Sequence, residues 1–502
     1  MLRRFLHNTA ISAVAFGLAG VLGLFSVGLI AKFYGLTVLG LIALTRAFLP
    51  NGFLSLIDFG VSEITTQMVA RGRLGDWAAA NERVSFLTMV AAVTGLISSV
   101  AIWFGAPSLA VIFTVAPEEA PAFISILKVT ALITPLAFIG LIMEGALKGF
   151  EEYAWLRMTE VGGNLLYVAA IYLAVRNKLP FEWIAYAYLA TVVVKYFVLA
   201  VIVAIVAHSS KLGPSAWSPE TRDDLVYRCW LMFNGRIGGV LQQTIIPLAI
   251  GAMYGPAQVG AYDLLMRLPR FLKAVLSPLF SAILPISAHL YEKTDVRRLQ
   301  ILGRNSFVLP AAVVVPILVL MALYSEEILI VWVGPQSAAQ WPWLALALVV
   351  PAANSMINAG QTALMVRADF MRFANRFLYS QVLLQYAVTL LTLHWFQDRA
   401  FILGWVLSYI TMTPVLMHRM FRLMALPRRL FWEHVARQVL VAALLTVFVL
   451  SYKMYFAPTT LPALVVAGTI GCIAAWALSL TLILSRRDRA MFGNFARAIT
   501  PR

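Results

Sequence analysis

Cysteine, acidic residues and long polar segments are all scarce in this 502-residue chain. Its only cysteines, Cys229 and Cys472, lie far apart, within or beside apolar runs. We interpret them as packing residues, which excludes a disulfide framework and a thiolate metal site. Charged residues make up 12% of the chain and hydrophobic residues 61%, with a mean hydropathy of +0.83. A soluble protein of this length needs more polar surface, so the composition predicts an all-α polytopic membrane protein.

Signatures of catalysis are missing as well. The sequence has no Walker A motif, no HExxH motif and no paired carboxylates on a predicted outer loop, and its six histidines are scattered. The predicted outer loops are too short to hold a catalytic domain. We therefore expect no enzymatic activity, no cofactor and no metal site.

Apolar runs of about 20 residues, the length that one membrane span needs, recur along the whole chain and predict about 14 transmembrane helices. The first run, 9–31, follows a basic segment but is too long for a cleaved signal peptide. Most of the Lys and Arg residues fall in alternate loops, which places both termini in the cytoplasm. The net charge of +16 is thus explained by topology, and nucleic acid is not an expected partner.

A weak internal repeat suggests how the predicted helices are grouped. The pair Tyr34-Gly35 with Gly40 recurs 220 residues later as Tyr254-Gly255 with Gly260. This offset corresponds to six predicted spans, and parallel six-span repeats in membrane proteins commonly form two lobes around a central cavity. We predict an N-terminal six-helix lobe at 1–207, a cytoplasmic connector at 208–227 and a C-terminal six-helix lobe at 228–420. An interfacial segment, two further helices and a basic tail occupy 421–502.

Seven cations remain inside the predicted spans, although each costs roughly 2.5–3.5 kcal/mol on insertion scales. Residues 252–290 hold three of them. Six are predicted to line a cationic cavity for an anionic substrate: Arg46, Lys128, Arg236, Arg267, Arg270 and Lys273. Plainer interpretations stay open, because Arg46 and Lys128 are shallow enough to snorkel to the outer interface and Arg267 lies one turn from Asp263. The seventh cation, Lys195, has no obvious acidic neighbour in the sequence.

Acidic residues inside the predicted spans are fewer. Asp58, Glu63, Glu144 and Glu160 fall in the cytoplasmic half, and Asp263 falls in the outer half. Asp58, Glu144 and Asp263 are candidates either for counter-ions of the cations or for carriers of a coupling proton. The sequence does not choose between these roles.

Two stretches resemble a known family. AKFYGLTVLGLIALTRAF with SLIDFGVSEITTQMVARG, within 31–72, and QQTIIPLAIGAMYGPAQVGAYDLLMRL at 242–268 are similar to polysaccharide or O-antigen flippases of the multidrug/oligosaccharidyl-lipid/polysaccharide exporter superfamily. The resemblance implies two lobes working by alternating access. It also implies a substrate of undecaprenyl-pyrophosphate carrying a glycan repeat unit, moved from the cytoplasmic to the periplasmic leaflet of the bacterial inner membrane. Arginine suits this chemistry because its guanidinium pairs with phosphate in bidentate geometry.

Other functions compete with this expectation. A peptidoglycan lipid-precursor flippase would use the same cationic cavity, whereas a multidrug exporter of the same superfamily would prefer an acidic one. A structural scaffold for polysaccharide enzymes is the alternative outside transport. Expected partners are the lipid-linked glycan, membrane lipids, and polysaccharide polymerase and glycosyltransferases. The basic amphipathic segment 419–437 is predicted to lie on the anionic cytoplasmic leaflet.

Overall fold

A computed structural model describes residues 2–208, 212–281, 283–292, 296–456 and 458–484, and every regular element in these ranges is a helix. Within these described ranges, ten helices are long and apolar enough to cross a membrane, or eleven if one bent pair counts as a single span. The chain is therefore a multi-pass helical membrane protein, as predicted. The predicted number of 14 spans is not confirmed by this criterion, because several predicted spans are divided into shorter helices.

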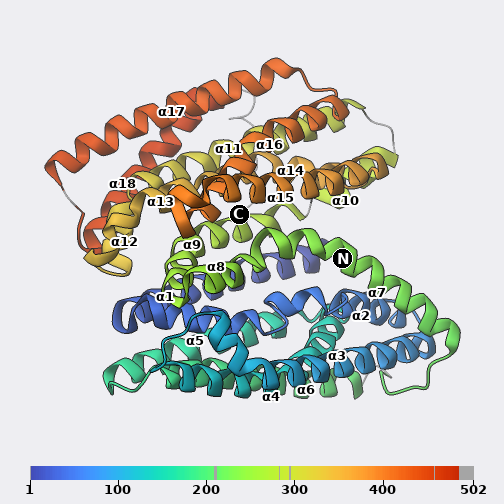
Figure 1. Cartoon of the computed structure of the whole chain (residues 1–502). Coiled ribbons are helices and arrows are strands. Elements are labelled where there is room, and N and C mark those ends of the chain that lie inside the picture. The colour runs from blue at the N-terminus through green and yellow to red at the C-terminus, as the bar shows by residue number, and fades with distance from the viewer. Residues whose placement is uncertain (1, 209–211, 282, 293–295, 457, 485–502) are drawn as a thin grey trace. The chain divides into compact units, whose positions relative to one another are not determined.

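The chain divides into two compact units, 1–264 and 265–502, and the division falls within helix α9. The predicted lobe boundaries at 207 and 228 stay a prediction. Figure 1 shows the elements of both units. The first unit contains α1 (Leu2–Ala47), α2 (Val61–Gly72), α3 (Trp77–Ile112), α4 (Ala120–Gly149), α5 (Tyr153–Arg176), α6 (Glu182–His208), α7 (Pro219–Gly239), α8 (Ile246–Tyr254) and the beginning of α9 (Pro256–Ser281).

Helix α4 is the packing centre of the first unit. It contacts α2, α3 and α6, and it buries the large side chains of Phe123 and Phe138. Two glycines near its end allow the close approach of α2: a Cβ on Gly145 would lie 2.4 Å from the Ser62 carbonyl oxygen, and one on Gly149 would lie 2.6 Å from the Val69 side chain. Small residues commonly allow helices to pack closely in lipid. Burying apolar side chains between helices gains little there, because the lipid tails are equally apolar.

Several predicted spans are interrupted. Helix α1 is kinked at Gly35 and ends at Ala47, before Pro50. A short 3₁₀ turn at Phe53–Leu56 then leads to α2. Helices α7 and α8 are separated by a π-helical turn at Val240–Thr244 and are bent by 43°. Such breaks are tolerated in a membrane where protein or water satisfies the freed backbone groups.

The second unit holds the remaining helices. They are the rest of α9, α10 (Ile283–Glu292), α11 (Val296–Leu323), α12 (Ser325–Trp332), α13 (Trp341–Ala347), α14 (Val349–Leu364), α15 (Ala368–Phe396), α16 (Ala400–Leu423), α17 (Arg428–Tyr455) and α18 (Leu461–Leu478). Short 3₁₀ turns occupy Pro335–Gln340 and Gln397–Arg399, and a π-helical turn follows α18 at Ser479–Ile483. A core of this unit joins α11, α14, α15, α16 and α17 through side chains such as Phe307, Phe370 and Phe421.

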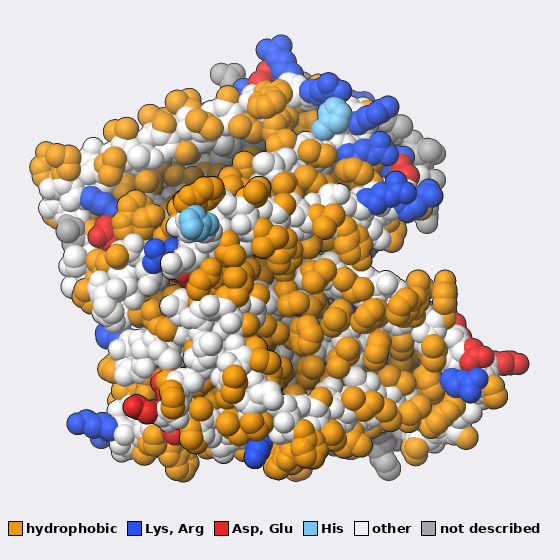
Figure 2. All heavy atoms as spheres, in the orientation of Figure 1, with side chains coloured by type: hydrophobic (Ala, Val, Ile, Leu, Met, Phe, Trp, Pro, Cys, Tyr) orange, Lys and Arg blue, Asp and Glu red, His pale blue; other side chains and the backbone are white. Residues whose placement is uncertain are grey.

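The surface is predominantly apolar, as a lipid-facing protein requires. Large hydrophobic side chains such as Leu383, Leu391 and Val447 are exposed over most of their area. Figure 2 shows this apolar surface, and it shows basic side chains gathered at the end of the second unit where α16 ends and α17 begins. Arginines at the ends of helices on one side of the membrane fit the sequence-based orientation.

Candidate functional site

The internal repeat has a counterpart in the backbone. Gly35 has φ 85° and ψ 175°, and Gly255 has φ 85° and ψ 178°. A positive φ of this kind is readily adopted only by glycine. In each copy the Tyr-Gly pair therefore ends one helical segment and starts the next in the same conformation. The two copies share a local backbone conformation as well as three identical residues.

The two copies also contact each other. A Cβ on Gly40 would lie 1.8 Å from the Pro256 carbonyl oxygen, and one on Gly260 would lie 1.9 Å from the Leu36 carbonyl oxygen. Leu36 and Pro256 are related by the same 220-residue offset as the two glycines, so the contact is reciprocal. The end of α1 and the start of α9 thus cross at backbone distance. This crossing positions the side chains that follow each glycine, including Arg46 and Asp263.

Arg46 lies in an aromatic cage within the first unit. Its guanidinium carbon is 4.4 Å from the ring centre of Tyr188 on α6 and 5.5 Å from that of Tyr167 on α5. The two rings pack edge to face, 5.4 Å apart. Asp263, at the start of α9, is buried and interacts electrostatically with Arg46. The Nε atom of Arg46 is buried without a hydrogen-bond partner among the described residues.

Arg236 is held by carboxylates instead. Its guanidinium forms an ion pair with Asp58 and a second with Glu63, the latter at 2.6 Å, and it donates to the Ser55 carbonyl oxygen at 3.3 Å. Asp58 also accepts the Gly60 N–H at 2.8 Å, which fixes the left-handed glycine at the start of α2. This group contains two acids and one base. Asp58 is thus placed as a counter-ion of Arg236.

Lys195 has a partner that the sequence did not reveal. Its Nζ lies 2.6 Å from a carboxylate oxygen of Glu144 on α4, and Lys148 lies 3.9 Å from the other oxygen of the same group. Lys148 also donates to Ser62 on α2 at 3.3 Å. Glu144 is buried, so it is placed as the counter-ion that joins α4 to α6.

Lys128 lies on α4, half-buried, with its Nζ 5.5 Å from the ring centre of Trp103 on α3. Lys128 thus contacts an aromatic ring, as Arg46 does. The indole of Trp103 is itself partly exposed, which agrees with an interfacial position as well as with a cavity.

In the second unit, Lys273 on α9 reaches helix α16. Its Nζ donates to the Tyr409 hydroxyl at 2.6 Å and lies 5.0 Å from the ring centre of Tyr409 and 5.9 Å from that of Trp405. Both aromatic residues are buried. Arg270 precedes Lys273 by one turn and Arg267 precedes Arg270 by another, so the three cations follow one face of α9. Arg267 and Arg270 are half-buried.

The intramembrane cations thus fall into two chemical classes. Arg236 and Lys195 are neutralised by carboxylates, whereas Arg46, Lys128 and Lys273 contact aromatic rings. An aromatic ring attracts a cation through its quadrupole, by about 0.5–2 kcal/mol, but carries no charge. The rings therefore do not neutralise these cations, and Arg46 also interacts electrostatically with Asp263. The rings themselves were missed from the sequence; the available signal was the run of tyrosines and tryptophans in 183–188 and 405–409.

Comparison with known proteins identifies the family. A family model described as polysaccharide biosynthesis protein matches residues 29–342, which is more than half of the chain. The chain belongs to this polysaccharide biosynthesis family. A comparison with curated protein sequences found no match.

Solved structures show the same fold at low identity. The lipid II flippase MurJ in an inward closed conformation matches with a TM-score of 0.70 and 13% identity, over 94% of this chain and 98% of that one. A multidrug resistance MATE family transporter of the MOP superfamily, inward-facing, matches with a TM-score of 0.53 and 12% identity, over 83% and 94%. A MOP superfamily transporter from Pyrococcus furiosus matches with a TM-score of 0.52 and 12% identity, over 83% and 95%. This polysaccharide biosynthesis protein thus has the fold of MurJ and of the MATE transporters.

Proposed function

We propose that the protein is a flippase that moves an undecaprenyl-pyrophosphate-linked oligosaccharide, an O-antigen or exopolysaccharide repeat unit, from the cytoplasmic to the periplasmic leaflet. It would work by alternating access in the bacterial inner membrane, with both termini in the cytoplasm. Membership of a polysaccharide biosynthesis family and the fold of membrane transporters support this proposal. Polymerase and glycosyltransferases are its proposed partners because they consume and supply such a substrate.

The aromatic cage of Arg46 is the observation that carries the proposal. A guanidinium inside a membrane segment is costly, and a purely structural arginine would be matched by carboxylates, as Arg236 is. Arg46 contacts two aromatic rings and interacts electrostatically with one buried acid, Asp263, and it retains a buried Nε without a hydrogen-bond partner in the described part of the chain. A pyrophosphate supplies the acceptors that such a donor needs.

The cations of α9 provide a second set of donors for the same substrate. Lys273 is oriented by Tyr409, and Arg270 and Arg267 follow it on the same helix face. We propose that Arg46 and Lys128 of the first unit and these three residues of the second bind the pyrophosphate or an acidic glycan. Arg236 belongs to the predicted set too, and its release from Asp58 and Glu63 would have to precede any contact with substrate.

A reconstituted transport assay tests the proposal. The purified chain is placed in liposomes with a fluorescently labelled undecaprenyl-pyrophosphate oligosaccharide, and a membrane-impermeant quencher reports how fast the label changes leaflet. We expect Arg46→Ala to abolish the acceleration and Arg46→Lys to retain part of it, because charge is kept but bidentate geometry is lost. Arg222→Ala is the matched control, since Arg222 is exposed and pairs only with its neighbour Asp223 among the contacts described. Full activity of Arg46→Ala would contradict the assignment.

A peptidoglycan lipid-precursor flippase is the second candidate, favoured by the extent of the fold match to the lipid II flippase MurJ. The same liposomes loaded with labelled lipid II distinguish the two. Movement of the oligosaccharide lipid without lipid II supports the polysaccharide substrate, and movement of lipid II alone supports the alternative. Movement of neither would contradict both.

A further inference from the structure

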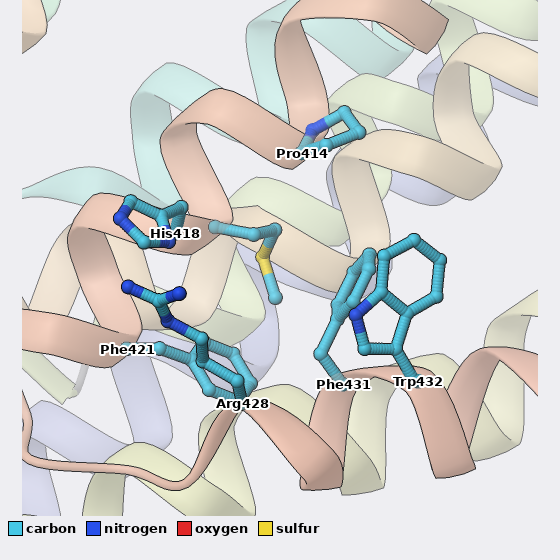
Figure 3. A pocket seen from close by; sticks show the side chains of 7 residues that line it. Pro414, His418, Phe421, Arg428, Phe431 and Trp432 are labelled. Atoms are coloured by element: carbon cyan, nitrogen blue, oxygen red, sulfur yellow. The ribbon is translucent and has the colours of Figure 1, made fainter.

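A pocket of about 280 Å³ opens in the second unit, where α16 ends and α17 begins. It is lined by Pro414, Met417, His418, Phe421, Arg428, Phe431 and Trp432. Figure 3 shows His418 and Arg428 together on one side, with Phe431 and Trp432 facing them from the other. The pocket is therefore polar on one wall and aromatic on the opposite wall.

The floor and rim of the pocket differ in exposure. Met417 and Phe421 are buried in the core of the unit, and Phe421 packs edge to face against Phe431. His418 and Arg428 are exposed, and the Trp432 side chain is 68% exposed. The floor is thus rigid, whereas the donors and the indole at the rim are free to meet a ligand from the membrane side.

The chain reversal between the two helices explains this arrangement. Ala425 has a positive φ of 51°, and Pro427 precedes the first turn of α17 in an extended conformation. The tight link brings Arg428 back toward the last turns of α16. Among the described residues that line the pocket, none is a carboxylate. The nearest acid in sequence, Glu433, pairs with Arg429 instead.

Two apolar stripes lead away from the pocket along the helices. On α16, Leu407 and Ile410 precede Pro414 and His418 at helical spacing and are exposed. On α17, Val439 follows Trp432 at the same kind of spacing and is 63% exposed. In a membrane protein, such stripes face hydrocarbon. A ligand held by the polar wall can therefore continue into the bilayer as an apolar chain.

The position of the pocket indicates the class of ligand that it binds. It lies at the end of the unit where arginines gather, which the charge bias assigns to the cytoplasmic leaflet. That leaflet carries anionic phospholipids, and basic residues near it gain about 1 kcal/mol each from the negative surface. Tryptophan is enriched at the same depth because its ring is apolar and its N–H is polar.

We propose that this pocket binds one anionic phospholipid of the cytoplasmic leaflet. The headgroup phosphate accepts from Arg428 and His418, the glycerol region lies against Trp432, and the acyl chains follow the exposed stripes of α16 and α17. A free phosphate would leave the aromatic wall unused, and a zwitterionic lipid would bring a second cation beside Arg428. The proposal does not depend on which substrate the protein transports.

Lipid-dependent stability of the full chain in detergent tests the site. Dioleoyl phosphatidylglycerol is titrated against the wild type, Arg428→Ala and Arg429→Ala, and the rise in Tm gives the apparent affinity. Arg429 is the matched control because it is the adjacent arginine, is exposed, and does not line the pocket. We expect the affinity of Arg428→Ala to fall roughly five- to tenfold, with little change for Arg429→Ala and no saturable shift with dioleoyl phosphatidylcholine.

Mapping the bound lipid provides the second readout. Phosphatidylglycerol with a photoreactive acyl chain should label α16 or α17 beside the pocket in the wild type and in Arg429→Ala, and much less in Arg428→Ala. Equal weakening by the two arginine variants would overturn the proposal, because it would indicate diffuse attraction to the basic surface. A shift with undecaprenyl phosphate but not with phosphatidylglycerol would also overturn it, in favour of a carrier-lipid site.

Discussion

Gly40 and Gly260 face each other so closely that a Cβ on either would lie within 2 Å of a backbone carbonyl oxygen of the other segment. Backbone cannot yield as a flexible side chain does, so the helices must separate to admit even a methyl group. The crossing also fixes where Arg46 and Asp263 emerge. The stability of the first unit and the position of Arg46, which we propose binds the substrate, therefore depend on the same pair of glycines.

The first prediction concerns these glycines. Gly40→Ala or Gly260→Ala should lower stability by about 1–3 kcal/mol, the usual cost of overpacking a closely packed contact. Gly105→Ala on α3 is the matched control, because nothing lies within 4 Å of its added Cβ. That variant should be neutral or slightly stabilising. Thermal unfolding in detergent compares the three, and equal Tm values would contradict the close crossing.

The fold was largely predictable from the sequence because lipid imposes a simple rule: backbone must be helical and outer side chains apolar. Interruptions were harder to place. Pro50 disfavours a continuous helix at that position, but the length of the break before α2 depends on tertiary contacts such as the ion pair of Asp58 with Arg236. Hydropathy averages over such breaks, which is why some predicted spans are divided between two helices, such as α7 and α8.

The sequence identified candidate residues for the site, but it did not identify the residues that they contact. Lys195 and Glu144 are 51 positions apart, and no pattern within one helix connects them. Asp263 also interacts electrostatically with Arg46, which lies far from it in the sequence. Tyr167 and Tyr188 were missed for the same reason. Contacts between helices depend on how the helices pack against each other, and the spacing of residues in the sequence does not reveal that packing.

A second prediction separates the two acids at Arg236. The Asp58 side chain is 6% exposed and also caps Gly60, whereas the Glu63 side chain is 50% exposed. Asp58→Ala should therefore cost about 3–5 kcal/mol, because it leaves a poorly solvated guanidinium and a buried N–H unsatisfied. Glu63→Ala should cost less than about 1 kcal/mol. Thermal unfolding measures both, and a larger loss for Glu63→Ala would reverse the assignment of the principal counter-ion.

A third prediction concerns the pair that joins α4 and α6. Glu144→Gln should destabilise the protein by roughly 3–5 kcal/mol, because it leaves Lys195 unmatched. Lys195→Met should cost less, because Lys148 still lies 3.9 Å from the other oxygen of Glu144. The double variant should recover much of this loss, since both charges are gone. The exposed pair Arg222 and Asp223 provides the control cycle, with a coupling below about 1 kcal/mol. Additive losses in the double variant would show that the two side chains do not interact.

The last prediction tests the aromatic cage of Arg46. Tyr188→Phe keeps the ring at 4.4 Å and should retain transport, whereas Tyr188→Leu removes the quadrupole and should weaken substrate binding about threefold to thirtyfold. Tyr172→Leu on α5 is the control, because Tyr172 is 58% exposed on the outer surface. Substrate concentration dependence in the liposome assay distinguishes weaker binding from slower movement. If Tyr188→Phe and Tyr188→Leu lose activity equally, the hydroxyl rather than the ring supports Arg46, and the guanidinium would then be held by a hydrogen bond instead of by a cation–π contact.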